Sequence, residues 1–217
     1  MSARFDIGAA SARLSPGRPL VIVDADEVLL RFVDGFDRFL RNNGLYLDLS
    51  SYRLHGNVKR LDDNTPVLDV EVTALLDAFR GDLDSLDLVE GAADALASFG
   101  ARADVVVLTN ISEAQAPARL RNLQIHGLHF PVVANSGPKG PAVKALTSRA
   151  AASFFVDDIP QHLASVAEAA PEVFRIHLIG DERLKPLLPP ATHAHLRAND
   201  WAEAGAFVHA RLDEAGH

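Results

Sequence analysis

Two pairs of aspartates follow hydrophobic runs of the chain, and their type and spacing suit chemistry. Asp24 and Asp26 come after an aliphatic run at 20–23. Asp157 and Asp158 close another hydrophobic run. Carboxylates gathered at one place repel one another unless a cation neutralises them. Because the donors are oxygens and the chain has no cysteine, the expected partner is a hard cation, Mg²⁺.

A hydroxyl, an amide and a lysine could complete such a site. Thr109 and Asn110 follow the aliphatic run at 103–108, and Lys139 precedes a helix that Pro141 is suited to begin. Taken alone, Lys139 is most simply a solvated loop residue. Together with the acids, a lysine and a Thr hydroxyl supply the positive charge and donors that phosphate oxygens need. These residue types suit phosphoryl transfer, which depends on positioning and charge stabilisation.

Hydrophobic runs of strand length alternate with helical patterns along the chain. This alternation predicts an α/β fold, a Rossmann-like parallel sheet with helices on both faces. Ligands of such sheets bind at the carboxyl ends of the strands. Turn residues alone would not require three strands to end in acids or a hydroxyl. The predicted strands are 20–23, 103–108, 130–134, 153–156 and 173–178, and the predicted helices are 32–43, 65–80, 91–99, 141–146, 160–170 and 201–212.

The chain does not return to a second central strand directly after its first helix. Residues 32–85 carry more than one helical pattern, which predicts a small α-helical cap inserted into a Rossmann-like core of residues 1–31 and 86–217. Residues 1–19 are expected to form an arm leading into the first strand. A basic cluster in the insertion is either a solvated polar loop or an anion-facing surface, and its members are Arg53, His55, Lys59 and Arg60.

The composition of the chain limits the kinds of partner that we expect it to bind. The formal charge of −8 and the pI near 5.5, without a basic stripe, argue against a nucleic-acid polymer. No hydrophobic run approaches the roughly 20 residues of a membrane span, and the first nineteen residues do not read as a secretory signal. We therefore expect a cytoplasmic protein without a membrane partner. No heptad pattern indicates an oligomeric state.

The motifs at these strand ends resemble those of the haloacid dehalogenase superfamily, and the resemblance covers residues 20–180. Each motif is short by itself. Their order, and their positions at successive strand ends, carry the resemblance. The motifs are the stretch Asp-Ala-Asp-Glu-Val at 24–28, Thr109, Lys139 and the pair Asp157-Asp158.

The resemblance implies catalytic roles for four residues and a substrate contact for a fifth. Asp24 would be the nucleophile and form an aspartyl-phosphate. Asp26 would protonate the leaving oxygen and then activate water. Thr109 and Lys139 would hold the transferring phosphoryl group, and Asn110 would contact the substrate.

The resemblance also implies a Mg²⁺ cofactor. Asp24 and the backbone carbonyl of Asp26 would bind the ion, with Asp157 and Asp158 completing its shell directly or through water. Superfamily members that displace halide lack the second acid of the first motif and need no metal. The presence of Asp26 therefore favours hydrolysis of a phosphate ester.

The substrate implied is a small phosphorylated metabolite, either a sugar phosphate or a nucleotide. The cap would close over the site, with Arg53, His55, Lys59 and Arg60 as substrate contacts. One alternative is a phosphosugar mutase that uses the same aspartyl-phosphate. Another is a phosphate-binding regulatory protein without turnover, suggested by Glu27, which stands where the superfamily's phosphatases commonly have glycine.

Overall fold

A six-stranded parallel sheet forms the centre of the molecule. The computed structural model describes residues 5–81 and 83–217. The strand order is β5-β4-β1-β6-β7-β8, so the predicted Rossmann-like α/β fold is confirmed. The strands are β1 (Leu20–Val23), β4 (Asp104–Asn110), β5 (Val132–Asn135), β6 (Ser153–Asp157), β7 (Phe174–Leu178) and β8 (Leu196–Ala198).

Helices cover both faces of this sheet. Successive side chains of a strand point to opposite faces, so Val21 of β1 packs into one core cluster and Ile22 into the other. Burial on both faces explains the unbroken aliphatic run of β1. The first face is covered by α4 (Ala92–Gly100), α5 (Ala116–Ile125) and α8 (Trp201–Glu214), the second by α1 (Ile7–Ser11), α6 (Gly140–Thr147) and α7 (Pro160–Ala169).

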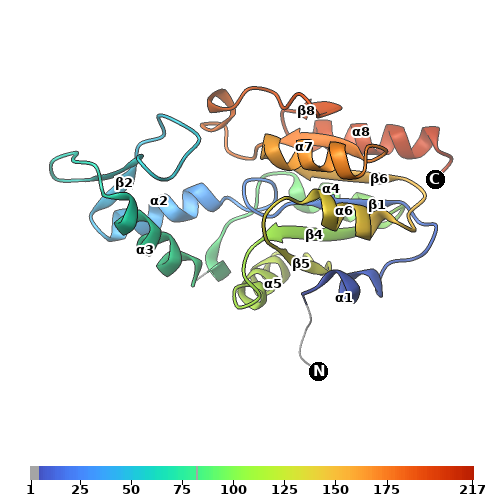
Figure 1. Ribbon diagram of the computed structural model, residues 1–217, viewed down its shortest axis with the longest axis horizontal. Coiled ribbons are helices and arrows are strands. Elements are labelled where there is room, and N and C mark those ends of the chain that lie inside the picture. Colours follow the sequence, from blue (N-terminus) through green and yellow to red (C-terminus); the bar gives the residue numbers. More distant parts are fainter. Residues whose placement is uncertain (1–4, 82) are drawn as a thin grey trace.

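Residues 32–85, called the insertion below, lie at the left of Figure 1, at the end of the sheet away from the C-terminus. Aromatic packing holds its two helices together, with the rings of Phe32 and Phe79 centred 5.2 Å apart. A pair of antiparallel strands accompanies the predicted helices, and residues 58–60 are strand where a polar loop was one interpretation. The insertion comprises α2 (Phe32–Asn42), β2 (Leu45–Leu47), β3 (Val58–Arg60), α3 (Asp69–Arg80) and the 3₁₀ turn η1 (Leu83–Ser85).

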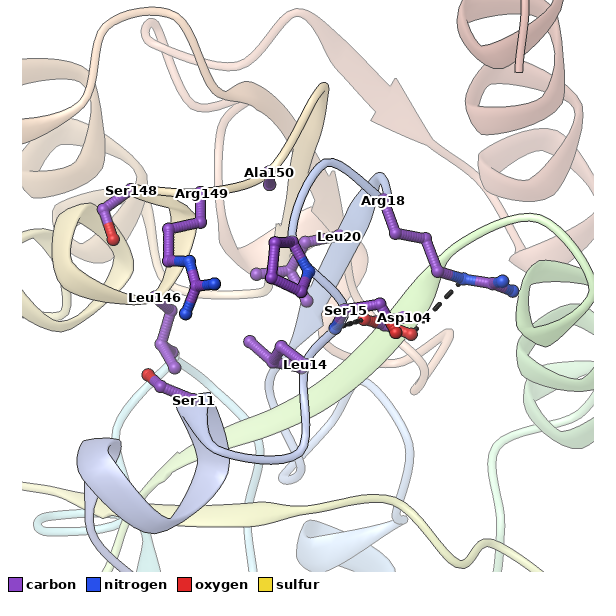
Figure 2. Close-up of a pocket in the computed structure, with 11 residues that line it drawn as sticks. Ser11, Leu14, Ser15, Arg18, Leu20, Asp104, Leu146, Ser148, Arg149 and Ala150 are labelled. Carbon is purple, nitrogen blue, oxygen red and sulfur yellow. Dashed lines mark hydrogen bonds and ion pairs between the residues drawn. The ribbon is translucent and has the colours of Figure 1, made fainter.

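The N-terminal arm contains α1 and is fastened at the amino ends of the strands (Figure 2). The Ser15 backbone N–H donates to the Asp104 carboxylate (2.6 Å), and Arg18 pairs with the same side chain (3.3 Å). The cavity beside them measures about 30 Å³, room for little more than water. The arm is thus held against the amino end of β4. Among the described residues, no helix has the length and apolar character needed to cross a membrane.

Candidate active site

Three central strands bring predicted site residues to one edge of the sheet. The parallel register pairs Val23 of β1 with Val107 of β4 and Val156 of β6, so the residues after them lie side by side. The backbone N–H of Asp24 donates to the Val156 carbonyl (2.9 Å), which extends the β1–β6 pairing by one residue. The buried polar residues at this carboxyl edge include Asp24, Thr109, Asp157 and Asp158.

Lys139 is fully buried between two of these acids. Its Nζ lies 2.6 Å from Asp24 Oδ1 and 2.8 Å from Asp157 Oδ2. Gly140 allows α6 to approach α7, because a Cβ atom there would lie 2.2 Å from the Ser165 carbonyl oxygen. Burial lowers the pKa of Lys139, but attraction to Asp157 and Asp24 outweighs burial and raises the pKa above its ordinary value. Lys139 is therefore a charged counter-ion to both carboxylates.

Three carboxylates form a compact group of candidate metal ligands. One oxygen from each of Asp24, Asp157 and Asp158 lies within 4.8 Å of the other two. Burial raises the pKa of Asp157 to about 7, although Lys139 opposes the shift. Burial, followed by repulsion from Asp157 and Asp24, raises the pKa of Asp158 well above its ordinary value. This all-oxygen group fits a hard divalent cation such as Mg²⁺, which would replace the protons and offset the repulsion.

The Thr109 hydroxyl is buried at the same edge and has no hydrogen-bond partner among the described residues. Buried hydroxyls are normally paired, so this group fits an oxygen of a bound anion. The exposed residue Asn110 donates through its amide to the Gly137 carbonyl (3.0 Å) and accepts from Asn135 (2.7 Å). Asn110 thereby braces the loop that leads to Lys139.

The Asp26 side chain turns to an arginine that was not among the residues predicted from the sequence. Arg119 is fully buried on α5, and its Nη2 lies 2.5 Å from Asp26 Oδ1. Burial raises the pKa of Asp26, and Arg119 opposes the shift. The sequence does contain an indication that Arg119 is buried, because helical spacing places it on the same face as the apolar residues Ala116 and Leu123.

Glu27 adopts a left-handed backbone conformation, with φ at +57°. Glycine adopts this conformation without strain, so a glycine would be well suited to the position that Glu27 occupies. The Glu27 side chain is buried, and its Oε1 accepts a hydrogen bond from the Val33 backbone N–H at the start of α2 (2.7 Å). Its carbonyl accepts from the Gly180 N–H (2.5 Å). Burial raises the pKa of Glu27 to about 8, so the carboxyl carries a proton at neutral pH.

The basic cluster of the insertion bonds within the insertion. Among the hydrogen bonds and ion pairs of the described residues, none joins this cluster to the strand-end acids. The insertion reaches those acids instead through Tyr52, whose hydroxyl donates to Asp158. Lys59 forms an ion pair with Asp48 (2.5 Å), Arg60 forms one with Glu71 (3.5 Å), and His55 is hydrogen-bonded to Thr73 (3.0 Å). Arg53 lines a cavity of about 50 Å³ together with Val33 and Leu184.

Comparison with known proteins identifies the fold. No protein-family model and no curated protein matches the sequence. Solved structures of low sequence identity do match, and the chain has the fold of haloacid dehalogenase-like hydrolases. The resemblance predicted from the motifs is therefore confirmed at the level of the fold.

Three of these structures illustrate the match. A haloacid dehalogenase-like protein of unknown function from Agrobacterium tumefaciens has 16% identity and a TM-score of 0.62, over 90% of this chain and 99% of that one. CbbY from Rhodobacter sphaeroides in complex with phosphate has 18% identity and a TM-score of 0.55, over 87% and 98%. The HAD-hydrolase YfnB from Bacillus subtilis bound to magnesium has 15% identity and a TM-score of 0.57, over 89% and 99%.

Proposed function

We propose that this protein is a Mg²⁺-dependent phosphatase that hydrolyses a small phosphorylated metabolite, a sugar phosphate or a nucleotide, through an aspartyl-phosphate. The supporting observation is the buried Lys139 ammonium between Asp24 and Asp157. The same edge carries the Thr109 hydroxyl, which has no hydrogen-bond partner in the part of the chain that the structure describes. A nucleophile, a fixed positive charge and a hydroxyl donor are then available to one phosphoryl group. Phosphoryl transfer depends on such positioning and charge stabilisation.

The proposed reaction has two steps. Asp24 attacks phosphorus, so that a bond from its carboxylate oxygen to phosphorus forms while the bond from phosphorus to the ester oxygen breaks. Asp26 gives a proton to that oxygen as the alcohol leaves. Water then attacks the aspartyl-phosphate, Asp26 accepts the proton, and inorganic phosphate departs with Asp24 restored. Lys139 and Thr109 hold the phosphoryl oxygens in both steps.

The carboxylates Asp24, Asp157 and Asp158, with the backbone carbonyl of Asp26, would hold the Mg²⁺. The bound ion supplies positive charge opposite the phosphoryl oxygens. Two neighbours of the same fold support this proposal. YfnB was solved bound to magnesium, and CbbY was solved with phosphate and, as a mutant, with xylulose-(1,5)bisphosphate.

We propose that the insertion, residues 32–85, acts as a cap over a core of residues 1–31 and 86–217 and selects the substrate. Contacts to the part of the substrate beyond its phosphate would come from the basic cluster and from the strand end. Lys59 and Arg60 would then exchange their present acidic partners for the substrate. The proposed contacts are Arg53, His55, Lys59, Arg60 and Asn110.

Hydrolysis of p-nitrophenyl phosphate, followed by a panel of sugar phosphates and nucleotides, tests this function. We expect Mg²⁺-dependent release of free phosphate, lost on chelation. Asp24→Asn should reduce the rate at least about 1,000-fold, because it removes the nucleophile. The exposed acid Asp77 offers a control, since Asp77→Asn should leave the rate unchanged. A rate on p-nitrophenyl phosphate that survives Asp24→Asn contradicts the proposal, and isomerised phosphate in place of free phosphate identifies a mutase.

A further inference from the structure

Arg119 joins two segments that are far apart in the sequence. It lies on α5, which follows β4, and its guanidinium contacts the carboxylate of Asp26, which follows β1. The arginine side chain is fully buried, whereas the aspartate side chain is 32% exposed. One end of the pair is therefore fixed by packing, and the other end faces the site.

The contact uses a single oxygen of the aspartate. Nη2 of Arg119 donates to Oδ1 of Asp26, so Oδ2 is not engaged by the arginine and can contact another group. The Asp26 carboxylate is also outside the group that Asp24, Asp157 and Asp158 form. Among residues 5–81 and 83–217, Arg119 is the one hydrogen-bond or ion-pair partner of this carboxylate. Arg119 is thus the side chain that sets the direction of this carboxylate.

Burying a guanidinium for this contact is costly. Two of its nitrogens, Nε and Nη1, have no partner among the described residues. A buried donor without a partner destabilises the folded state, so packing alone does not account for an arginine here. Leucine or methionine would fill the same space on α5 without that cost. The position is therefore better explained by its effect on Asp26.

We propose that Arg119 is a positioning residue, which holds the Asp26 carboxyl away from the metal ligands with one oxygen directed at the leaving group. This inference rests on the proposed function, in which Asp26 transfers a proton to the departing oxygen. Without Arg119, the carboxyl can rotate, and a proton reaches the leaving oxygen less often. The loss is then greatest for esters whose alcohol is a poor leaving group.

Single-turnover kinetics with excess enzyme and Mg²⁺ test this role, with phenyl phosphate and p-nitrophenyl phosphate as paired probes. Nitrophenolate leaves readily without protonation, whereas phenolate does not. We expect Arg119→Met to slow phenol release about 100-fold, the scale of general acid catalysis, and to slow nitrophenol release less than about tenfold. Arg119→Lys should recover part of the loss on phenyl phosphate. Arg121→Met, on the solvent side of the same helix, should leave both rates unchanged.

A double-mutant cycle separates positioning from a general loss of structure. Because Arg119 acts through Asp26, adding Arg119→Met to Asp26→Asn should slow phenol release no further than Asp26→Asn alone. Equal losses on the two probes, or additive losses in the cycle, overturn the inference and leave the phosphatase standing. A wild-type chain that releases neither phenol overturns the phosphatase, and the role of Arg119 falls with it. Mg²⁺ titration by calorimetry should give the same affinity for Arg119→Met and wild type, and loss of Mg²⁺ binding also overturns the inference.

Discussion

The hydroxyl of Tyr52 donates a hydrogen bond to the carboxylate of Asp158, and this contact links the insertion to the acids at the sheet edge. Tyr52 belongs to the loop between β2 and β3, while Asp158 directly follows β6. The segment proposed to select the substrate therefore touches a residue proposed to bind the metal. Occupancy of the metal site and the position of this loop should depend on each other.

Replacing Tyr52 tests this dependence. Burial and the neighbouring acids raise the pKa of Asp158, and the Tyr52 hydrogen bond opposes them. Tyr52→Phe should raise that pKa further, so Mg²⁺ must displace a more tightly held proton. We expect Mg²⁺ affinity to fall about tenfold at pH 7, the value of one hydrogen bond to a charged group, and the difference to shrink at pH 9.

Calorimetric titration with Mg²⁺ at several pH values measures that change. Tyr46→Phe serves as the control, because the Tyr46 hydroxyl bonds to Asn64 in an exposed part of the insertion. Its Mg²⁺ affinity should equal that of wild type. Tighter binding in Tyr52→Phe would mean that the tyrosine competes with the metal for Asp158, and would contradict this account.

The stability of the metal-free protein should fall as the pH rises toward neutrality. Asp157 loses its proton near pH 4 in an unfolded chain but near pH 7 in the folded one, because burial raises its pKa. The folded chain therefore binds more protons between these values and loses stability as the pH rises through them. Asp158 acts in the same direction.

Thermal unfolding in EDTA at pH 5 to 8 measures this trend. We expect the Tm to decline across the range, and Mg²⁺ to raise the Tm more at pH 8 than at pH 5, since the ion binds the ionised acids. Asp158→Asn should show a smaller decline and a smaller response to Mg²⁺. A metal-free Tm that increases steadily from pH 5 to 8 would show that these acids do not dominate the titration.

Glu27 gives a third prediction, which concerns stability alone. Its carboxyl would ionise near pH 4.5 when unfolded and near pH 8 when folded, because burial raises its pKa, so this group too costs stability as the pH rises through that window. Glu27→Gln keeps an acceptor for the Val33 N–H and has no proton to lose. We expect its Tm to exceed that of wild type by about 3 to 6 °C at pH 8, with little difference at pH 5.

The exposed residue Glu71 provides the matched control, and Glu71→Gln should leave the Tm unchanged at both pH values. Glu27→Gly separates the backbone from the side chain. Glycine relieves the left-handed strain but removes the hydrogen bond to Val33, so this variant should not reproduce the pH-dependent gain of Glu27→Gln. Equal gains at pH 5 and pH 8 for Glu27→Gln would contradict a titrating carboxyl.

The sequence was sufficient for the features that depend on local pattern and on the shared edge of a parallel sheet. A buried central strand is apolar throughout, and its last residues reach the carboxyl edge, so Asp24, Thr109 and Asp157 could be placed together. Strands of three residues, such as β2, β3 and β8, are too short to show alternation. The helices of the insertion were predicted, but its strand pair was not.

Contacts between distant segments left no pattern in the sequence. Arg119 is 93 residues from Asp26 and Tyr52 is 106 from Asp158, and neither pair has a characteristic spacing. The basic cluster of the insertion illustrates the converse. Its residues suggest an anion, but local acids such as Asp48 satisfy Lys59 in the folded chain. Only the three-dimensional arrangement distinguishes a cation that is already paired from one that faces the site.

Lys139 bears on whether the chain could fold before it binds a metal ion. Acids at the ends of neighbouring central strands would oppose the pairing of β1 with β6 if nothing balanced their charge. The ammonium group between Asp24 and Asp157 supplies that balance from within the chain. The charges at this edge are therefore balanced without an ion, and under the proposed function Mg²⁺ would enter and leave the folded protein without unfolding it. Loading with metal would then be a reversible event of the folded molecule, separate from its folding.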